Sequence, residues 1–496
     1  MKDLALLCDL GSTFTKVVAV EVASGSVIAW AKAPSTVDAD VTEGLEQAIR
    51  EAERQGGFRW QEARWRLASS SAAGGLRMVA VGLVPELTGE AARRAALGAG
   101  AKVVGVFCYE LTDAEVRDLE EARPDIILLA GGTDGGNKGV LLHNARCLAR
   151  ARSEAPVVVA GNKVVAGEVG RVLREAGKEV FITENVLPSL GSLNVEPARR
   201  VIREVFIRRI VRAKGFDRAG RYVEGVLMPT PTAVLRAAEV LAGSAITGGN
   251  AAAATCCPRA SGHPAVGGRP GGAGAAVLVV DVGGATTDVH SVGRGDPSEA
   301  GLIPKGLPEP ESKRTVEGDL GVRCNAPSIL EATGPEGLSA RLRVVAPEVE
   351  PMGAADLEAE VQRLARETWR LPADDRGVAL DAALAAAAVD LAVSRHAGQV
   401  EELYTPGGKV SVLVGKDLRE FGLLVGTGGP LVSNPHRRLT LEAALWDPGR
   451  PHVLKPRRPR MLVDQHYIMF AAGLLAERDP EAAGRVLQGN LVEVDH

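Results

Sequence analysis

Two short stretches, each an aspartate and a glycine turn between apolar runs, most constrain what this 496-residue chain can fold into. The more informative one is Asp281-Val-Gly-Gly-Ala-Thr-Thr-Asp288, which lies between an apolar run, 275–280, and an alternating run, 289–292. This pattern predicts a strand, a tight turn and a second strand. Gly283 and Gly284 permit positive φ and close approach of a bound group to the backbone. Successive backbone N–H groups in such a turn form a concave site for an anion.

The side chains of this stretch indicate which anion would bind. Thr286 and Thr287 add hydroxyl donors beside the turn. Asp281 and Asp288 would repel a bare phosphate, so their presence implies a divalent cation between the carboxylates and the anion. The stretch therefore predicts a magnesium–polyphosphate site.

A second copy of the pattern, Asp9-Leu-Gly-Ser-Thr-Phe-Thr-Lys16, lies near the start of the chain. An aspartate again ends an apolar strand, a glycine makes the turn, and Ser12 and Thr13 supply hydroxyls. Lys16 can meet phosphate oxygens as a point charge. A single hairpin of this kind is most simply an ordinary β-turn. Two copies, each with a strand-terminal aspartate, favour a paired phosphate site.

Composition narrows the class of protein. The hydrophobic fraction of 46% supports sizeable cores, and the length allows two or more domains. A net charge of −4 and 3% aromatic residues argue against a general nucleic-acid surface. The six cysteines have no metal-ligand spacing and suit a reducing cytosol. The start of the chain leaves no room for a signal peptide, and no run approaches a membrane span. We therefore expect a cytoplasmic protein with no nucleic-acid or membrane partner.

The order of predicted elements suggests two lobes. Three strands over 3–33, a helix over 42–54 and a strand over 66–70 are followed by alternating strands and helices from 78 to 182, typical of a parallel sheet. A Gly- and Ala-rich stretch then precedes the second hairpin. We expect a first lobe over 1–245, a linker or loop over 246–275, and a second lobe over 276–496.

The two hairpins resemble the phosphate loops of the actin, hexokinase and DnaK-type chaperone ATPase superfamily. Phe421-Gly-Leu-Leu-Val-Gly-Thr-Gly-Gly-Pro430 is similar to the adenosine-binding loop of that superfamily, and the three occur in its order. The resemblance implies a two-lobed α/β actin-like (ribonuclease H-like) fold with duplicated core sheets and an elaborated first lobe. A late helix, 467–477, is expected to cross back between the lobes.

A closer resemblance spans nearly the whole chain. Its motifs are Leu128-Leu-Ala-Gly-Gly-Thr-Asp-Gly-Gly-Asn137, Gly161-Asn-Lys-Val164, Glu184-Asn-Val-Leu-Pro188, Leu193-Asn-Val-Glu-Pro-Ala-Arg199, Arg314-Thr-Val-Glu-Gly-Asp-Leu-Gly321 and Arg395-His-Ala-Gly398. They resemble the MutL-type (GlmL-like) accessory proteins of glutamate mutase, which share only a name with the DNA mismatch-repair protein. The resemblance implies an ATP-dependent reactivating or chaperone component for adenosylcobalamin-dependent mutases of the glutamate mutase or aminomutase type.

The resemblance also implies site roles. Asp9 and Asp281 hold Mg²⁺ mostly through its waters, and Lys16 neutralises charge on the transferred phosphoryl group. Asp288, Glu317 or Asp319 orients the attacking water. The phosphates are held by Gly11, Ser12, Thr13, Gly283, Gly284, Ala285 and Thr286, and the adenosine pocket is lined by Gly426, Thr427, Gly428 and Gly429.

The expected function is therefore ATP binding and hydrolysis that reactivates an adenosylcobalamin-dependent mutase by cofactor exchange. The alternatives are a small-molecule kinase of the same superfamily, although no sugar-binding signature is found, and an actin-like nucleotide-binding structural protein. The sequence leaves open whether the protein forms a homodimer.

Two further patterns have competing interpretations. Asp288-Val-His290-Ser-Val-Gly293 fits a pattern by which some cobalamin enzymes present a histidine to cobalt. Its context is a strand after a phosphate loop, so we expect a satisfied core histidine. Leu129-Ala-Gly-Gly-Thr-Asp-Gly-Gly136 is interpreted as the first lobe's counterpart of the adenosine strand and turn, free for another ligand or a structural relic.

Overall fold

The computed structural model describes residues 3–11, 14–36, 40–71, 76–212, 220–243, 276–299, 301–350, 352–406 and 408–494. The expected linker, 246–275, lies outside these ranges. Ser12 and Thr13 of the first predicted phosphate loop lie outside them too.

The first lobe is built on a five-stranded sheet in the order β10-β4-β1-β2-β3. Its strands are β1 (Leu4–Leu10), β2 (Phe14–Glu21), β3 (Ser26–Pro34), β4 (Trp65–Ser70) and β10 (Val226–Pro229). One face is covered by α1 (Val41–Gly56), which begins where the Asp40 carboxylate accepts the Thr42 N–H and ends at Gly57 in the left-handed region. The predicted order of three strands, helix and strand is confirmed.

The second lobe repeats this sheet. Its strands are β11 (Val277–Val282), β12 (Thr287–Val292), β14 (Ser312–Glu317), β17 (Leu423–Thr427), β18 (Arg460–Asp464) and β19 (Leu491–Glu493). Their order is β14-β12-β11-β17-β18-β19. Without the edge strand β19, β18-β17-β11-β12-β14 matches β10-β4-β1-β2-β3 strand for strand. The predicted duplication of core sheets is therefore confirmed.

Helices and a small sheet complete the second lobe. The helices are α9 (Ala326–Val345), α10 (Ala354–Arg366), α11 (Asp375–His396), α12 (Gly429–Val432) and α13 (Arg437–Glu442), and the three-stranded sheet is formed by β13 (Ile303–Lys305), β15 (Gln399–Thr405) and β16 (Gly408–Val414). By length and composition α11 is apolar enough to span a membrane, contrary to the expectation from sequence. Most of α11 is buried in the lobe, where Asp381 and Asp390 form ion pairs.

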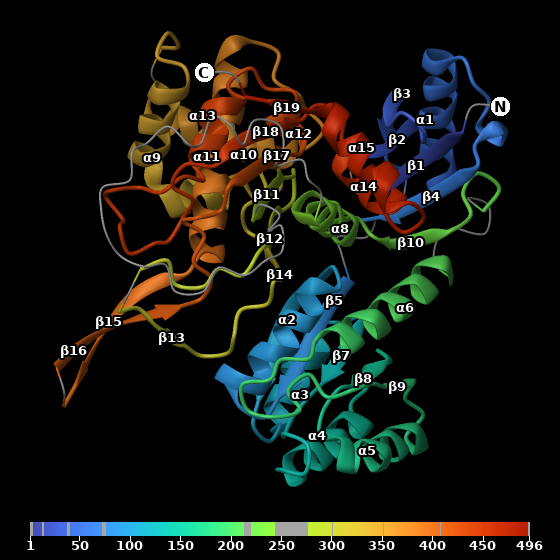
Figure 1. The fold of residues 1–496 in the computed structure, drawn as a ribbon, viewed down its shortest axis with the longest axis vertical. Helices are drawn as coiled ribbons and strands as arrows, with labels where there is room; N and C mark the ends of the chain where they lie inside the picture. Colours follow the sequence, from blue (N-terminus) through green and yellow to red (C-terminus); the bar gives the residue numbers. More distant parts are fainter. Residues whose placement is uncertain are drawn as a thin grey trace, which may run out of the picture.

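Three helices lie between the two sheets (Figure 1): α8 (Thr230–Gly243), α14 (Ile468–Leu475) and α15 (Pro480–Asn490). They share one apolar core with both sheets, for example Leu7 of β1 and Val279 of β11. A Cβ built on Gly473 would overlap the carbonyl oxygen of Ala233, so α14 packs against α8 so closely that only glycine fits at position 473. The late helix therefore crosses between the lobes, as predicted.

The stretch of alternating strands and helices forms its own domain, inserted between β4 and β10 and drawn below the lobes in Figure 1. Its parallel sheet has the order β6-β5-β7-β8-β9. The strands are β5 (Leu76–Gly82), β6 (Ala101–Cys108), β7 (Ile126–Leu129), β8 (Val157–Val159) and β9 (Val180–Ile182), and the helices are α2 (Glu90–Gly98), α3 (Asp113–Glu121), α4 (Gly139–Arg150), α5 (Lys163–Glu175) and α6 (Glu196–Arg212). The predicted parallel sheet is confirmed.

This arrangement corrects the interpretation of the glycine turn 131–136. The strand before it, β7, pairs within the inserted domain and not within the first lobe. The position equivalent to the adenosine strand β17 is occupied by β4, which ends at Ser69 and Ser70. A strand followed by glycines carries no information about which sheet it joins, and this led to the wrong assignment.

The close crossing of α8 and α14 gives a first prediction. Gly473→Ala should lower the free energy of unfolding by about 1–3 kcal/mol, because the added methyl group overpacks the junction between the lobes. Gly489→Ala is the matched control, since this exposed glycine of α15 has no atom within 4 Å of a built Cβ. It should stabilise the protein by about 0.5 kcal/mol through helix propensity. Denaturant unfolding of both variants checks the pair, and equal effects would contradict the packing argument.

Candidate functional site

Two rows of polar residues end the core strands of the two lobes. In the first sheet Asp9 pairs with Lys16 of β2 and with Ser69 of β4. In the second sheet Asp281 pairs with Asp288 of β12 and with Thr427 of β17. Side chains alternate between the two faces of a strand, so Asp9 points to the same face as Leu7, and Asp281 to the same face as Val279. Leu7 and Val279 both belong to the apolar core that the lobes share. The rows therefore lie on the two sheet faces that turn toward each other.

Asp9 is buried, and groups from two elements hold its carboxylate. The ammonium group of Lys16 lies 3.2 Å from Oδ2, and the hydroxyl of Thr230, at the start of α8, donates to Oδ1 at 2.6 Å. The same hydroxyl lies 3.2 Å from the Ser69 hydroxyl. Sequence reasoning missed Thr230 and Ser69. Each is a hydroxyl residue at or just after the end of a strand, and their proximity becomes visible only once β10 is placed beside β4.

Lys16 connects the two rows electrostatically. Burial alone would lower the pKa of its ammonium group, but Asp9 and Asp281 together raise that pKa above the ordinary value. The ammonium nitrogen also lies 4.8 Å above the ring of Tyr467, whose backbone adopts a left-handed conformation at φ 56° before α14. The lysine is therefore charged and fixed between the lobes, where phosphate oxygens are expected.

Asp281 of the second row has a strongly perturbed carboxyl group. Burial and the neighbouring Asp288 raise its pKa to about 7, while Lys16 acts in the opposite direction. Asp9 and Asp464 make smaller contributions to the same raised pKa. Four carboxyl groups thus outnumber the cationic side chains at this point, and this excess of negative charge is the environment that a divalent cation would relieve.

Asp464 ends β18 and fixes the far side of the second row. Its buried carboxylate accepts the N–H groups of Ile468 and Met469 at 2.8 and 3.0 Å, so it caps the start of α14. The hydroxyl of Thr427 donates to the same carboxylate at 3.1 Å. Asp464 is the last residue of β18, and Thr230 directly follows the equivalent strand β10, so both sheets have a polar residue near this strand end. Sequence reasoning missed this residue too.

The predicted adenosine turn packs directly against the second predicted phosphate strand. Gly428 has φ 95°, and a Cβ there would overlap the carbonyl oxygen of Val282 and lie 2.8 Å from Oδ1 of Asp281. Only glycine suits this position. The chain then enters α12 at Gly429, so Gly426–Gly429 form the expected strand and glycine turn beside Asp281, and a short helix follows them.

The glycine turn 283–286 is closed by the segment that leads from β14 into α9. The N–H of Gly283 donates to the carbonyl oxygen of Thr286 at 2.9 Å, which makes the tight turn. The N–H groups of Val322 and Arg323 donate to the carbonyl oxygens of Gly283 and Gly284 at 3.1 and 2.9 Å. The carbonyl oxygens of Gly283 and Gly284 thus already accept hydrogen bonds from within the protein.

The structure separates the three carboxylates expected to orient water. Asp288 lies on the same face as Asp281, where Nε and Nη2 of Arg314 donate to its Oδ1 at 3.0 and 2.6 Å. Glu317 pairs with Thr287, one position away, so it lies on the opposite face of β14. Glu317 and Asp319 both bind Arg395 of α11, at 2.8 Å. Of the three, only Asp288 joins the polar row.

His290 is a buried strand residue, as expected, but it is not satisfied. In the described part of the chain neither ring nitrogen has a hydrogen-bond partner. Burial, with a smaller effect of Arg314, lowers the pKa of its imidazole well below the ordinary value, so the ring is neutral. Within that same part no cluster of three His, Cys, Asp or Glu side chains is arranged to hold a metal ion. A cation at Asp9 and Asp281 would therefore keep most of its waters.

Comparison with known proteins assigns the family. A family model described as MutL protein matches residues 5–253 and 269–491. The curated Protein MutL of Clostridium tetanomorphum is 43% identical over 494 residues, which covers 99% of this chain and 100% of that protein. The chain belongs to the MutL protein family.

Similarities between this MutL family member and solved structures are distant. The chain is similar to component A of (R)-2-hydroxyglutaryl-CoA dehydratase from Acidaminococcus fermentans, with 10% identity, 97% and 98% of the two chains covered, and a TM-score of 0.31. It is also similar to xylulose kinase from Bifidobacterium adolescentis, with 12% identity, 100% and 96% covered, and a TM-score of 0.32. The actin-like assignment therefore rests on the duplicated sheets and not on these scores.

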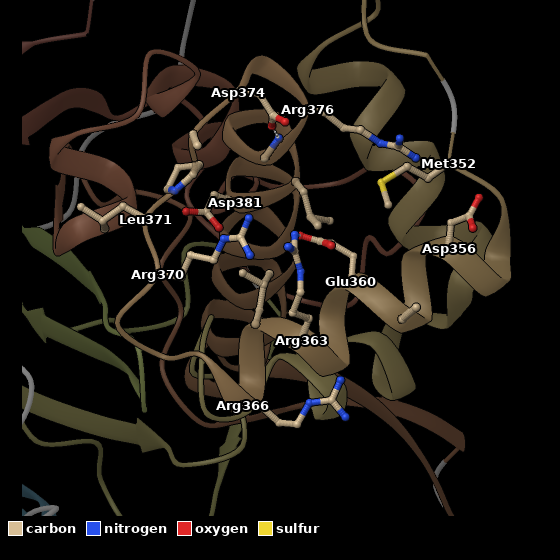
Figure 2. Close-up of a pocket in the computed structure, with 16 residues that line it drawn as sticks. Met352, Asp356, Glu360, Arg363, Arg366, Arg370, Leu371, Asp374, Arg376 and Asp381 are labelled. Carbon is tan, nitrogen blue, oxygen red and sulfur yellow. Dashed lines mark hydrogen bonds and ion pairs between the residues drawn. The ribbon is translucent and has the colours of Figure 1, made fainter.

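A cavity of about 630 Å³ opens in the second lobe of this MutL family member, between α10, the segment 370–374 and the start of α11 (Figure 2). The predicted adenosine residues 426–429 do not line it. Arg323 connects the cavity with the glycine turn: its N–H binds Gly284, and its guanidinium binds both oxygens of Asp381 in the cavity wall. The cavity thus lies one arginine side chain away from the glycine turn 283–286.

The raised pKa of Asp281 gives a second prediction. An aspartate in an unfolded chain has a pKa of about 3.9. Between that value and about 7, the folded protein keeps a proton that the unfolded chain has lost, so the free energy of unfolding falls as pH rises. Without divalent cations, Asp281→Asn should therefore be more stable than wild type by on the order of 2 kcal/mol at pH 8, and this gain should shrink toward pH 4.

Asp319→Asn is the control of opposite sign. Hydrogen bonds from Arg395 lower the pKa of Asp319, so this substitution should destabilise the protein at pH 8. Thermal unfolding in EDTA between pH 4 and pH 8 measures both variants. A metal-free Asp281→Asn protein that is less stable than wild type at pH 8 would contradict the assignment of Asp281 as an unrelieved buried charge.

Proposed function

We propose that this protein binds Mg²⁺·ATP between its two lobes and hydrolyses it. The observation that carries the proposal is the pair of facing polar rows, with Asp9 and Asp281 at equivalent strand ends and Lys16 charged between them. Asp9 and Asp281 would hold the cation mostly through its waters. Bound there, magnesium would neutralise charge on the phosphates.

The remaining roles follow from the position of each group. The backbone N–H groups of the turn 283–286, with the predicted loop residues Gly11, Ser12 and Thr13, would bind the β- and γ-phosphates. Lys16 would neutralise charge that develops on the transferred phosphoryl group. Asp288 would orient the attacking water, because it lies in the polar row with Asp281, whereas Glu317 lies on the opposite face of β14 and Asp319 pairs with Arg395 outside the row.

The nucleoside would extend from the glycine turn toward the cavity beside α10. The close approach of Gly428 to Asp281 supports a position for the phosphates beside the predicted adenosine turn 426–429. The link through Arg323 from Gly284 to Asp381 sets the direction from the phosphates to the cavity wall. The volume of the cavity is in the range of small-molecule sites, and half of its lining residues are charged, four of them arginines that could meet an anionic ligand.

The proposed role in the cell is reactivation of an adenosylcobalamin-dependent mutase of the glutamate mutase or aminomutase type, in the cytoplasm. Membership of the MutL family supports this partner. The physical basis is linkage. A protein that binds an open mutase better than a closed one shifts the mutase toward release of inactive cofactor, by no more than the difference in affinity. ATP hydrolysis would then reset the complex so that intact cofactor is retained.

Reconstitution tests this function. The purified protein, ATP, Mg²⁺ and fresh adenosylcobalamin are mixed with a mutase loaded with hydroxocobalamin. We expect mutase activity to recover with ATP and not with Asp281→Asn, which removes a negative charge at the cation and should abolish hydrolysis. Phosphorylation of a small molecule without recovery of any mutase would favour the kinase alternative. Recovery that is equal with Asp281→Asn would disprove the proposed site.

The cavity gives a fourth prediction. Ala359→Trp adds a large ring to an exposed position that lines the cavity, and it should weaken ADP binding by about tenfold or more, which corresponds to about 1.4 kcal/mol. Ala355→Trp is the matched control, because Ala355 is exposed one turn earlier on α10 and does not line the cavity. Calorimetric titration measures both affinities. Equal affinities would mean that the nucleoside lies elsewhere.

A further inference from the structure

The inserted domain meets the second lobe along a polar seam, which consists of α2 and α6 on one side and residues 308–314 on the other. Arg94 of α2 donates to the carbonyl oxygen of Pro308 and to Glu309, at 2.7 and 2.6 Å. Arg199 of α6 donates to the carbonyl oxygen of Ser312 at 3.2 Å. The seam therefore includes the segment that leads into β14 and the first residues of that strand.

Arg314 lies at the inner end of this seam, and its side chain is only 3% exposed. Nε and Nη2 donate to Oδ1 of Asp288, in the polar row. Nη1 donates to the carbonyl oxygens of Leu97 and Ala101, at 2.9 and 3.3 Å. Leu97 belongs to the last turn of α2 and Ala101 begins β6, so one buried guanidinium binds the proposed nucleotide site and the inserted domain at once.

The charges around Arg314 make this contact sensitive to the state of Asp288. The two carbonyl oxygens lie at or just beyond the carboxyl end of α2, where the helix dipole favours a cation. The guanidinium thus has two competing attractions, a carboxylate in the site and a helix end in the inserted domain. A ligand that shares the charge of Asp288 changes the balance between them.

We propose that Arg314 is a positioning residue that couples nucleotide at the second phosphate loop to the placement of the inserted domain. The inference rests on the proposed nucleotide site and extends it. Coupling is reciprocal, so a partner that displaces the inserted domain would also change nucleotide affinity. Ala101, at the seam, is the first residue of β6. The carboxyl ends of the strands of this parallel sheet therefore lie at the edge farthest from the seam. A rotation of the domain about the seam would displace that edge most.

Arg314→Lys is the informative variant. Lysine keeps a positive charge beside Asp288, so nucleotide binding should survive. A single ammonium group, however, lacks the planar guanidinium of arginine, so it cannot bind a carboxylate and two carbonyl oxygens at the same time. Arg94→Lys is the matched control, since Arg94 bridges the same seam without touching Asp288. Hydrogen exchange of peptides covering 90–108 is measured with ADP, with a slowly hydrolysed ATP analogue and without nucleotide, and calorimetry measures binding.

We expect the nucleotide states of the wild type to differ by about threefold or more in exchange rate at 97–101, where the backbone is held by Arg314. Arg314→Lys should bind nucleotide and lose this difference, whereas Arg94→Lys should exchange faster in every state and keep it. Asp288→Asn breaks the same ion pair from its other end and should also lose the difference, so it provides the test if Arg314→Lys folds poorly.

The outcomes separate the inference from the function on which it rests. Nucleotide binding by the wild type without any change in exchange at 97–101 overturns the coupling alone. A full difference retained in Arg314→Lys overturns the role of Arg314. Absence of nucleotide binding by the wild type overturns the proposed function and the coupling together.

Discussion

The structure depends on how negative charge is arranged where the two core sheets face each other. Asp9, Asp281 and Asp464 lie at or next to the ends of their strands, Asp288 lies at the start of β12, and burial makes their mutual repulsion costly. Lys16 offsets part of it from the first lobe, and Arg314 offsets part of it from β14. Asp281 is left with its pKa raised to about 7. The folded chain therefore has an excess of buried negative charge here that a bound cation would neutralise.

Packing keeps these charges in place. α8 and α14 cross at Gly473 between the lobes, and the polar ends of both helices take part in the rows: Thr230 begins α8, and Asp464 caps α14. A change in the angle between the lobes would therefore move the rows relative to each other. Arg314 also connects Asp288 of the second row to the inserted domain. The packing between the lobes, the polar rows and the position of the inserted domain therefore depend on one another.

Local patterns predicted the hairpins well, because a strand-terminal aspartate and a glycine turn determine their geometry within a few residues. Thr230 and Ser69 were missed because β10 joins β4 only after the whole inserted domain, and that pairing leaves no local signal. Glu317 was placed in the site on sequence proximity, yet register puts it on the opposite face. The glycine turn 131–136 was assigned to the wrong sheet because pairing partners are not encoded in the turn.

The most direct test of the account is to locate the cation. Crystals grown with Mn²⁺ and a slowly hydrolysed ATP analogue give an anomalous signal at the metal. The account predicts one strong peak between the carboxylates of Asp9 and Asp281, with phosphate oxygens on its other side and the turn 283–286 around them. A nucleotide bound away from both rows, or a metal peak that neither carboxylate approaches directly or through water, would contradict it.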